Sequence, residues 1–215
     1  EEEQIQLFFS DIEPLAASKV LIRLENETLS IGQRILSQGL QLTVRGQDKI
    51  GIIGPNGVGK STLLAKLHQL LSGKREISLG FMPQAYQETL QLVLSPVEFL
   101  SQTGHKEEIQ KIQSRLASLN FSYPEMHHQI HSLSGGQQGK LLLLNLVLRK
   151  PHFLLLDEPT RNFSPTSQPE IRKLFANYSG GLVTVSHDRR FLKEVCTSIY
   201  SLTEHGLEVV DLQDL

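Results

Sequence analysis

A glycine-rich segment, Gly54 to Ser61, most narrows what this chain can fold into. It matches the pattern G-x-x-x-x-G-K-S/T, in which glycines allow successive backbone N–H groups to turn inward around phosphate oxygens. Residues 49–53 are mostly apolar and run into this segment, which predicts a short buried strand. Leucines at one-face spacing then predict a helix that ends at Ser72-Gly73. A strand, a phosphate-binding loop and a helix in this order predict an α/β domain that binds a nucleotide.

The positions of this loop have distinct expected tasks. Lys60 should reach the β- and γ-phosphates, and the Ser61 hydroxyl should bind Mg²⁺. Thr62 falls in the same first helical turn, near the phosphates. The residues that we expect to bind the nucleotide are Gly54, Pro55, Asn56, Gly57, Val58, Gly59, Lys60, Ser61 and Thr62.

Two adjacent carboxylates, Asp157 and Glu158, follow the apolar stretch 153–156. At the tip of a buried strand, Asp157 can meet the Mg²⁺ ion through water, and Glu158 can take a proton from an attacking water molecule. An isolated Asp-Glu pair is a solvated turn about as often as a catalytic site. The phosphate loop in the same chain favours the catalytic interpretation.

A second glycine-rich turn, Leu133 to Gln137, opens another predicted helix. It too presents backbone N–H groups and the positive end of a helix to an anion. One chain rarely needs two phosphate cradles. The pair makes sense if one of them serves a nucleotide that another domain holds.

The remaining pattern predicts one α/β domain with additions. Residues 20–24 and 40–44 predict strands ahead of the phosphate loop. Between residues 95 and 133, apolar residues recur at three- and four-residue steps among charged ones, which predicts a small helical subdomain. Strands then alternate with helices, which predicts a mainly parallel central sheet.

Composition excludes several classes of protein. The formal net charge is −2, so we expect no direct sequence-specific DNA binding. A single cysteine, Cys196, excludes an internal disulfide and is typical of a reducing compartment. No apolar run approaches the roughly 20 residues that cross a bilayer, and no signal peptide is evident, so we expect a cytoplasmic protein. The chain begins with Glu1 rather than Met, and we expect a fragment of something longer.

These elements, in this order and over nearly the whole chain, resemble the ATP-binding-cassette (ABC) ATPases. By that resemblance residues 54–62 are the Walker A motif, residues 133–137 the family signature and Asp157-Glu158 the end of the Walker B motif. The implied fold is a P-loop NTPase with a mainly parallel central sheet, an antiparallel β subdomain and a small helical subdomain. It implies one domain over residues 1–215, with the helical subdomain and its signature helix at about 95–150.

The resemblance assigns roles that the residues alone do not. Gln84, in Phe81-Met82-Pro83-Gln84, would be the Q-loop glutamine, which contacts Mg²⁺ and the lytic water. His187 would be the switch histidine, which contacts the γ-phosphate and joins Glu158 as a catalytic residue. The implied cofactors are ATP and Mg²⁺, with the metal near Ser61, Gln84 and Asp157.

The resemblance further implies a partner. The signature of ABC proteins closes over the nucleotide of an opposing cassette, on the same polypeptide or in a dimer. The residues that would act in trans are Ser134, Gly135, Gly136 and Gln137. An Mg-dependent ATPase is implied, with complete activity only beside that second cassette.

Two segments depart from the family pattern. ABC domains usually stack the adenine on an aromatic residue ahead of the first sheet strands, but residues 25–36 contain none, and Ile31 falls near the expected place. The family commonly has Asn-His-Leu-Asp after Thr160, whereas this chain has Arg161-Asn162-Phe163-Ser164. The second departure removes the acidic residue that helps to link the two sites, so we expect altered communication between them.

The kind of cassette is less constrained. Ser186 to Arg189, followed by Phe191-Leu192, resembles the F subfamily, soluble twin-cassette ATPases that act on ribosomes, some conferring antibiotic resistance. In that case Glu1 to Phe9 would be the exit of a linker into the second cassette. The alternative is the nucleotide-binding domain of a transporter, docked on a membrane domain. A chromosome or repair scaffold would need a long coiled coil between Ser61 and Leu133, for which there is no room.

Three histidines, at 127, 128 and 131, have spacing that a metal site could use. No cysteine or carboxylate completes a convincing ligand set beside them. We therefore interpret them as part of a solvated helical face.

Overall fold

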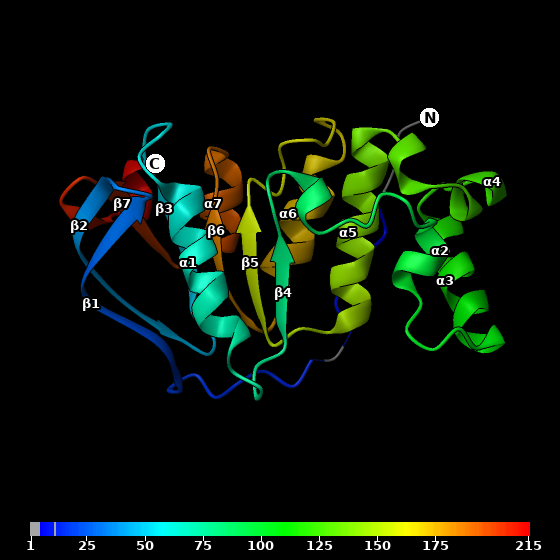
Figure 1. Cartoon of the computed structure of the whole chain (residues 1–215), viewed down its shortest axis with the longest axis horizontal. Coiled ribbons are helices and arrows are strands. Elements are labelled where there is room, and N and C mark those ends of the chain that lie inside the picture. The colour runs from blue at the N-terminus through cyan, green and yellow to red at the C-terminus, as the bar shows by residue number, and fades with distance from the viewer. Residues whose placement is uncertain (1–4, 11) are drawn as a thin grey trace.

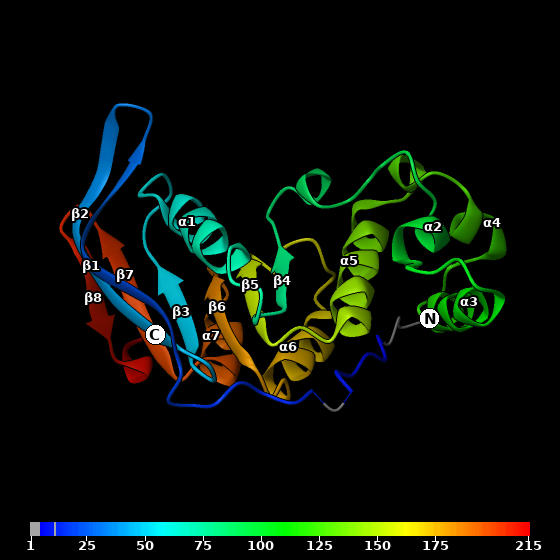
Figure 2. The same ribbon diagram turned by 60° about the horizontal axis from the view of Figure 1, so that its bottom comes forward.

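The structure is a computed structural model that describes residues 5–10 and 12–215. The strands of its main sheet are β3 (Lys49–Ile53), β4 (Leu79–Met82), β5 (Phe153–Asp157), β6 (Gly181–Val185), β7 (Ser198–Thr203) and β8 (Gly206–Val210). Their order is β4-β5-β6-β3-β7-β8 (Figures 1 and 2). All neighbours pair in parallel except β7 with β8. The predicted α/β fold with a mainly parallel sheet is confirmed.

The central strands supply two hydrophobic cores, one on each face of the sheet, because side chains alternate along a strand. In β5, Phe153 belongs to the core shared with α1 (Lys60–Ser72), whereas Leu154 belongs to the core on the opposite face. Every residue of β5 and β6 is buried, which explains why apolar residues dominate both strands, with Asp157 and Thr184 as the polar exceptions. The helices that contribute to the second core include α5 (Gly135–Arg149), α6 (Gln168–Ala176) and α7 (Arg189–Val195).

A separate antiparallel ribbon is formed by β1 (Val20–Ile31) and β2 (Arg34–Arg45), and it projects beyond the main sheet (Figure 2). The predicted strands 20–24 and 40–44 are its inner ends. The polar residues between them also pair, up to a turn at Gly32, where φ is +56°. These outer halves are mostly exposed, so their sequence lacks the apolar alternation that marks a strand.

Short helices gather at the end of the molecule that lies beyond α5 (Figure 1). Two of them begin with reciprocal capping boxes, Ser95 with Glu98 and Ser122 with Glu125, which satisfy backbone donors at the helix start. The buried sides of these helices join the same core as α5. The elements are α2 (Pro96–Leu100), α3 (Lys106–Ser118), α4 (Tyr123–His127) and the 3₁₀ turn η2 (Ile130–Ser132).

The described part of the predicted linker exit, residues 5–9, is an extended segment, while residues 1–4 lie outside the described part. Ile5 and Leu7 are buried in the core with α5 and α6, and the Phe9 ring lies 4.7 Å from the Tyr178 ring. None of the helices in residues 5–10 and 12–215 is long and apolar enough to span a bilayer. The remaining 3₁₀ turns are η1 (Tyr86–Glu88) and η3 (Leu212–Asp214).

Candidate functional site

The phosphate loop joins the carboxyl end of β3 to the start of α1. Gly54, Gly57 and Gly59 have φ values of +153°, +82° and +112°, a region that favours glycine. At Gly54 space is short as well, because a Cβ atom there would lie 3.0 Å from the backbone oxygen of Leu202 and from a methyl of Val58. The glycines of the motif therefore occupy positions that larger residues would strain.

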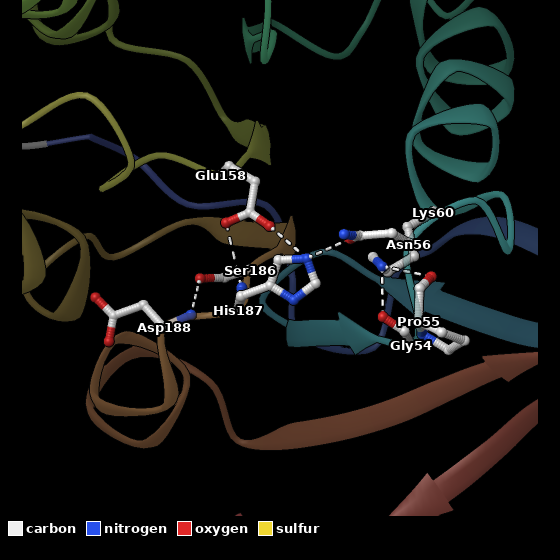
Figure 3. A network of polar contacts seen from close by, with 8 residues as sticks. All are labelled: Gly54, Pro55, Asn56, Lys60, Glu158, Ser186, His187 and Asp188. Carbon is white, nitrogen blue, oxygen red and sulfur yellow. Dashed lines mark hydrogen bonds and ion pairs between the residues drawn. The ribbon is translucent and has the colours of Figure 1, made fainter.

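Lys60 folds back over this loop (Figure 3). Its Nζ donates to the backbone oxygens of Gly54 and Pro55, the second at 2.9 Å. Burial lowers the pKa of the Lys60 ammonium, and the charges of Glu158 and Asp157 oppose that shift. The cation is thus fixed inside the loop and electrostatically linked to both carboxylates.

Asp157 ends β5 as a buried carboxylate. Burial raises its pKa, and a hydrogen bond with the Ser61 side chain is the strongest opposing influence. Its Oδ1 atom is buried and has no hydrogen-bond partner in the described part of the chain. A buried polar atom without a partner is costly, and carboxylate and hydroxyl oxygens are ligands that Mg²⁺ accepts. Asp157 and Ser61 therefore fit a magnesium ion.

Glu158 and His187 face each other beside the loop (Figure 3). The backbone N–H of His187 donates to Glu158 Oε2 at 3.2 Å, and His187 Nε2 lies 3.4 Å from Oε1. The same Nε2 lies 3.1 Å from Oδ1 of Asn56 in the loop. Glu158 has φ +49°, uncommon for a residue with a side chain, and its N–H donates to the Val185 oxygen of β6. Carboxylate, imidazole and phosphate loop thus form one network.

A loop that follows β6 holds His187 in place. Asp188 caps α7 through Oδ1, which accepts from the Phe191 N–H at 3.1 Å. Its Oδ2 accepts from the Thr160 hydroxyl at 3.1 Å, and its N–H donates to Ser186 Oγ at 3.0 Å. The segment after Glu158 and the segment that carries His187 are therefore tied together.

One cavity of about 750 Å³ joins these groups. Gly54, Pro55 and Val58 do not line it, and the first two instead accept from Lys60. The predicted residues that line it are Asn56, Gly57, Gly59, Lys60, Ser61, Thr62, Gln84, Asp157, Glu158 and His187.

The predicted signature lies apart from this cavity, at the start of α5. Ser134 is the N-cap of this helix: its Oγ accepts from the Gln137 N–H at 3.1 Å, and Gln137 Oε1 accepts from the Ser134 N–H at 3.0 Å. Ser134 and Gly135 are exposed. The structure therefore brings the Walker residues and His187 together and leaves the signature turn facing outward.

The cavity also has walls to which the motifs gave no role, and one of them, Ile31, falls near the place where the family usually has its adenine-stacking aromatic residue. Ile31 and Leu36, from the outer half of the ribbon, line it together with the phosphate loop. Both are aliphatic, in agreement with the absence of an aromatic residue between 25 and 36. Sequence spacing gave no signal for Leu36, because only the folded hairpin places it there. The others are Thr160, Arg161, Gln168, Val185 and Asp188.

Comparison with known proteins decides the family. Residues 37–161 match a family model described as ABC transporter. The chain belongs to this family. The ABC cassette that the motifs predicted is therefore confirmed, and with it the expectation of an ATP-binding ATPase domain.

Curated relatives extend the match over most of the chain. The probable ATP-binding protein YheS of Escherichia coli K12 is 30% identical over 210 residues, which cover 94% of this chain and 33% of that protein. The ribosome protection protein VmlR of Bacillus subtilis is 30% identical over 196 residues, which cover 88% of this chain and 36% of that protein. The chain thus spans about a third of the length of these relatives. The name of the first relative refers to ATP binding, and the name of the second refers to the ribosome.

Solved structures share the fold at low identity. The ABC cassette MJ0796, in a dimeric structure with ADP and Pi, has a TM-score of 0.72 at 20% identity, over 88% of this chain and 98% of that one. A bacterial Atm1-family ABC exporter with ATP bound has a TM-score of 0.75 at 16% identity, over 98% of this chain and 41% of that one. These likenesses confirm the predicted ABC ATPase fold.

Proposed function

We propose that this ABC cassette binds ATP with Mg²⁺ in its cavity and hydrolyses it with Glu158 as the general base. The observation that carries the proposal is the buried, unpartnered Oδ1 of Asp157, which lies beside Ser61 at the same cavity as the Glu158–His187 pair. A cation there would relieve the cost of that oxygen. The proposal therefore rests on the chemistry of the donors as well as on the motifs.

Each residue of the cavity has a task in this proposal. Lys60 leaves the carbonyls of its loop and binds phosphate oxygens with the loop amides. Ser61, Gln84 and Asp157 would hold Mg²⁺, which when bound neutralises phosphate charge. Glu158 orients a water molecule and accepts its proton, and His187 contacts the γ-phosphate.

The proposed reaction needs a second cassette. The signature turn lies outside the cavity of its own chain and is exposed at Ser134 and Gly135, so the start of α5 suits the phosphates of another nucleotide. The dimeric structure of the MJ0796 cassette supports such a pairing. We propose that residues 1–215 form one cassette, with residues 95–150 as its helical subdomain, within a longer cytoplasmic protein that supplies the other cassette.

Calorimetric titration of the chain with ATP, in Mg²⁺ and in EDTA, tests the binding part of the proposal. Affinity should be higher in Mg²⁺ for the wild type, and Asp157→Asn, which keeps the shape but removes the charge, should abolish most of that gain. Glu170→Asn is a control outside the cavity and should keep it. Equal affinities in Mg²⁺ and EDTA for the wild type would contradict the proposed metal site.

The biological setting that we propose is the ribosome, supported by the name of VmlR and by the resemblance of residues 186–192 to the F subfamily. The longer protein with Glu158→Gln should sediment with ribosomes in ATP and not in ADP. The runner-up is a transporter domain, supported by the Atm1-family exporter that shares the fold. Membrane-spanning segments encoded in the same gene or operon, together with no ribosome association, would favour that alternative.

A further inference from the structure

A glycine notch on α5 receives side chains from two other segments of the site. Gly139 lies in the first turns of α5, just after the signature, and is buried. A Cβ atom on Gly139 would lie 2.8 and 3.2 Å from ring atoms of Phe163 and 3.0 Å from the Tyr86 hydroxyl oxygen. Contacts under about 3.0 Å require something to move, so even alanine would not fit unless a ring were displaced.

The two rings come from segments that also carry cavity residues. Tyr86 begins η1, two residues after Gln84, and packs against α5. Phe163 lies five residues after Glu158, in the segment that departs from the family pattern, where the family commonly has leucine. Both side chains are only 7% exposed. At this notch the segment after Gln84 and the segment after Glu158 therefore both pack against the signature helix.

Hydrogen bonds tie the loop that carries Phe163 to the segments beside it. The Phe163 N–H donates to the Thr160 oxygen at 3.3 Å, and its own oxygen accepts from Gln168 Nε2 at 3.3 Å. Thr160 in turn donates to Asp188, next to His187. A shift of the Phe163 ring would therefore reach the loop between Glu158 and α6 instead of being absorbed by a free side chain.

We propose that Phe163 is a positioning residue that, by filling the Gly139 notch, fixes the signature turn relative to the Glu158 loop within one chain. The Phe163 ring is larger than the leucine that the family commonly has, and the absence of a Cβ atom at Gly139 leaves the room that this ring fills. Ser164 next to it has no charge to offer the partner site. Packing inside the cassette thus sets the relation between its two half-sites. The effect on turnover rests on the proposed ATPase function, whereas the contact itself does not.

A double-variant cycle on the 215-residue chain tests the contact. Gly139→Ala should lower the melting temperature by about 2–6 °C, since overpacking outweighs the gain in helix propensity. Phe163→Leu should also lower it, because it leaves a void. In the Phe163→Leu background, Gly139→Ala should cost nothing or restore stability. Additive losses in the double variant would overturn the proposed fit.

Hydrogen exchange separates positioning from general stability. Phe163→Leu should speed exchange of the amides of residues 138–142 by about tenfold or more, because the start of α5 loses its wedge. Phe175→Leu is the matched control, a buried phenylalanine on α6 that packs against Phe9 and Phe191. It should lower the melting temperature without that local change. Equal exchange at 138–142 in the wild type and Phe163→Leu would overturn the positioning role.

Turnover of the longer protein provides the functional readout. Gly139→Ala should lower kcat by about tenfold or more through misplacement of the signature turn, with ATP affinity changed less than about twofold, and Phe163→Leu in the same chain should restore part of it. Unchanged kcat in Gly139→Ala, with an active wild type, would overturn the coupling. A wild type without ATPase activity would instead contradict the proposed function, and the exchange and stability results would still decide the contact.

Discussion

The two glycine-rich turns of this cassette both open helices, but they differ in how the helix is capped and in what surrounds it. Gly59 caps α1 in a left-handed conformation without a side-chain hydrogen bond, whereas Ser134 caps α5 with a capping box. The phosphate loop before α1 lines the cavity: Lys60 donates to its carbonyls, and Asn56 Oδ1 lies 3.1 Å from His187 Nε2. The signature turn before α5 is exposed at Ser134 and Gly135 and lies outside that cavity, and the Ser134 and Gln137 side chains accept from each other's backbone N–H groups. Similar local sequence therefore yields a cavity in one place and an outward-facing helix end in the other.

The difference shows that a helix start becomes a working site only through the elements packed around it. The phosphate loop lies at the carboxyl edge of a parallel sheet, where β5 and β6 deliver Asp157, Glu158 and His187. The signature turn is not among the residues that line this cavity. In the proposed function, the chain thus holds one half-site for its own nucleotide and one that a partner cassette would complete.

The largest expected effect concerns the cavity beside the phosphate loop, which Glu158 lines. Glu158→Gln keeps the size of the side chain but removes the base, so turnover in the longer protein should fall about 10²- to 10⁴-fold. ATP affinity should stay near that of the wild type, because Lys60 and the loop amides are untouched. Steady-state ATPase assays and calorimetry measure the two quantities. Near-wild-type turnover would remove Glu158 from its assigned role.

The next effect concerns the exposed turn. Ser134→Arg in the longer protein should lower turnover about 10²- to 10³-fold, as the loss of an oriented donor does at other sites, while binding at Lys60 stays intact. Ser122 makes the same capping box at the start of α4, so Ser122→Arg controls for loss of a cap. Equal losses of turnover in the two variants would mean that Ser134 only caps its helix.

A smaller effect is the rise in melting temperature on nucleotide binding, which depends on the phosphate loop and not on the signature turn. At ten times Kd, Mg-ATP should raise the melting temperature of the isolated chain by about 3–6 °C. Lys60→Ala should abolish the shift, whereas Lys66→Ala, on the same helix and paired with Glu27, should keep it. A thermal-shift titration measures all three proteins. An undiminished shift in Lys60→Ala would separate the loop from nucleotide binding.

The smallest effect is a loss of stability at low pH, and it arises in the helical region that adjoins the signature helix. Glu108 accepts hydrogen bonds from the Thr103 hydroxyl, from the N–H groups of Gln102 and Thr103, and from the Ser101 hydroxyl. These bonds, that of the Thr103 hydroxyl first, lower the pKa of Glu108 to about 2. The unfolded value is about 4.3, so its contribution to stability is present above pH ~4.3 and is lost as the pH falls toward 2.

Melting temperatures of Glu108→Gln and the wild type, measured from pH 7 to pH 2, test this contribution. The variant should melt at a lower temperature at pH 7, and the difference should shrink between about pH 4.3 and pH 2. Glu107→Gln, at the neighbouring position, serves as the control. A difference that does not change with pH would show that the ionised Glu108 carboxylate has no stabilising role.

Most residues of the site could be predicted from local sequence motifs. The phosphate loop, Asp157-Glu158 and the mainly parallel sheet follow from residues close together in the chain, so their patterns are visible without the fold. The resemblance added Gln84 and His187, which the structure places along the same cavity. Their catalytic roles stay predictions.

Other parts depended on tertiary contacts. Strand β4 is short and contains Gly80, where a Cβ atom would lie 2.7 Å from Leu154, so packing rather than strand propensity placed it in the sheet. The β7–β8 hairpin was not predicted, because only β7 has a clear apolar pattern and β8 is largely exposed. The Gly139 notch was equally invisible, since it unites residues that lie far apart in the sequence.

The central claim, two half-sites that face different partners, is tested most directly by ATPase turnover per chain across dilution. The isolated 215-residue chain should hydrolyse ATP slowly, with turnover that falls further on dilution, because no second signature closes over its nucleotide. Restoring the second cassette in the longer protein should raise turnover per site at least about tenfold, in line with the cost of missing transition-state donors. Turnover of the isolated chain that equals that of the longer protein and does not change with concentration would contradict the account.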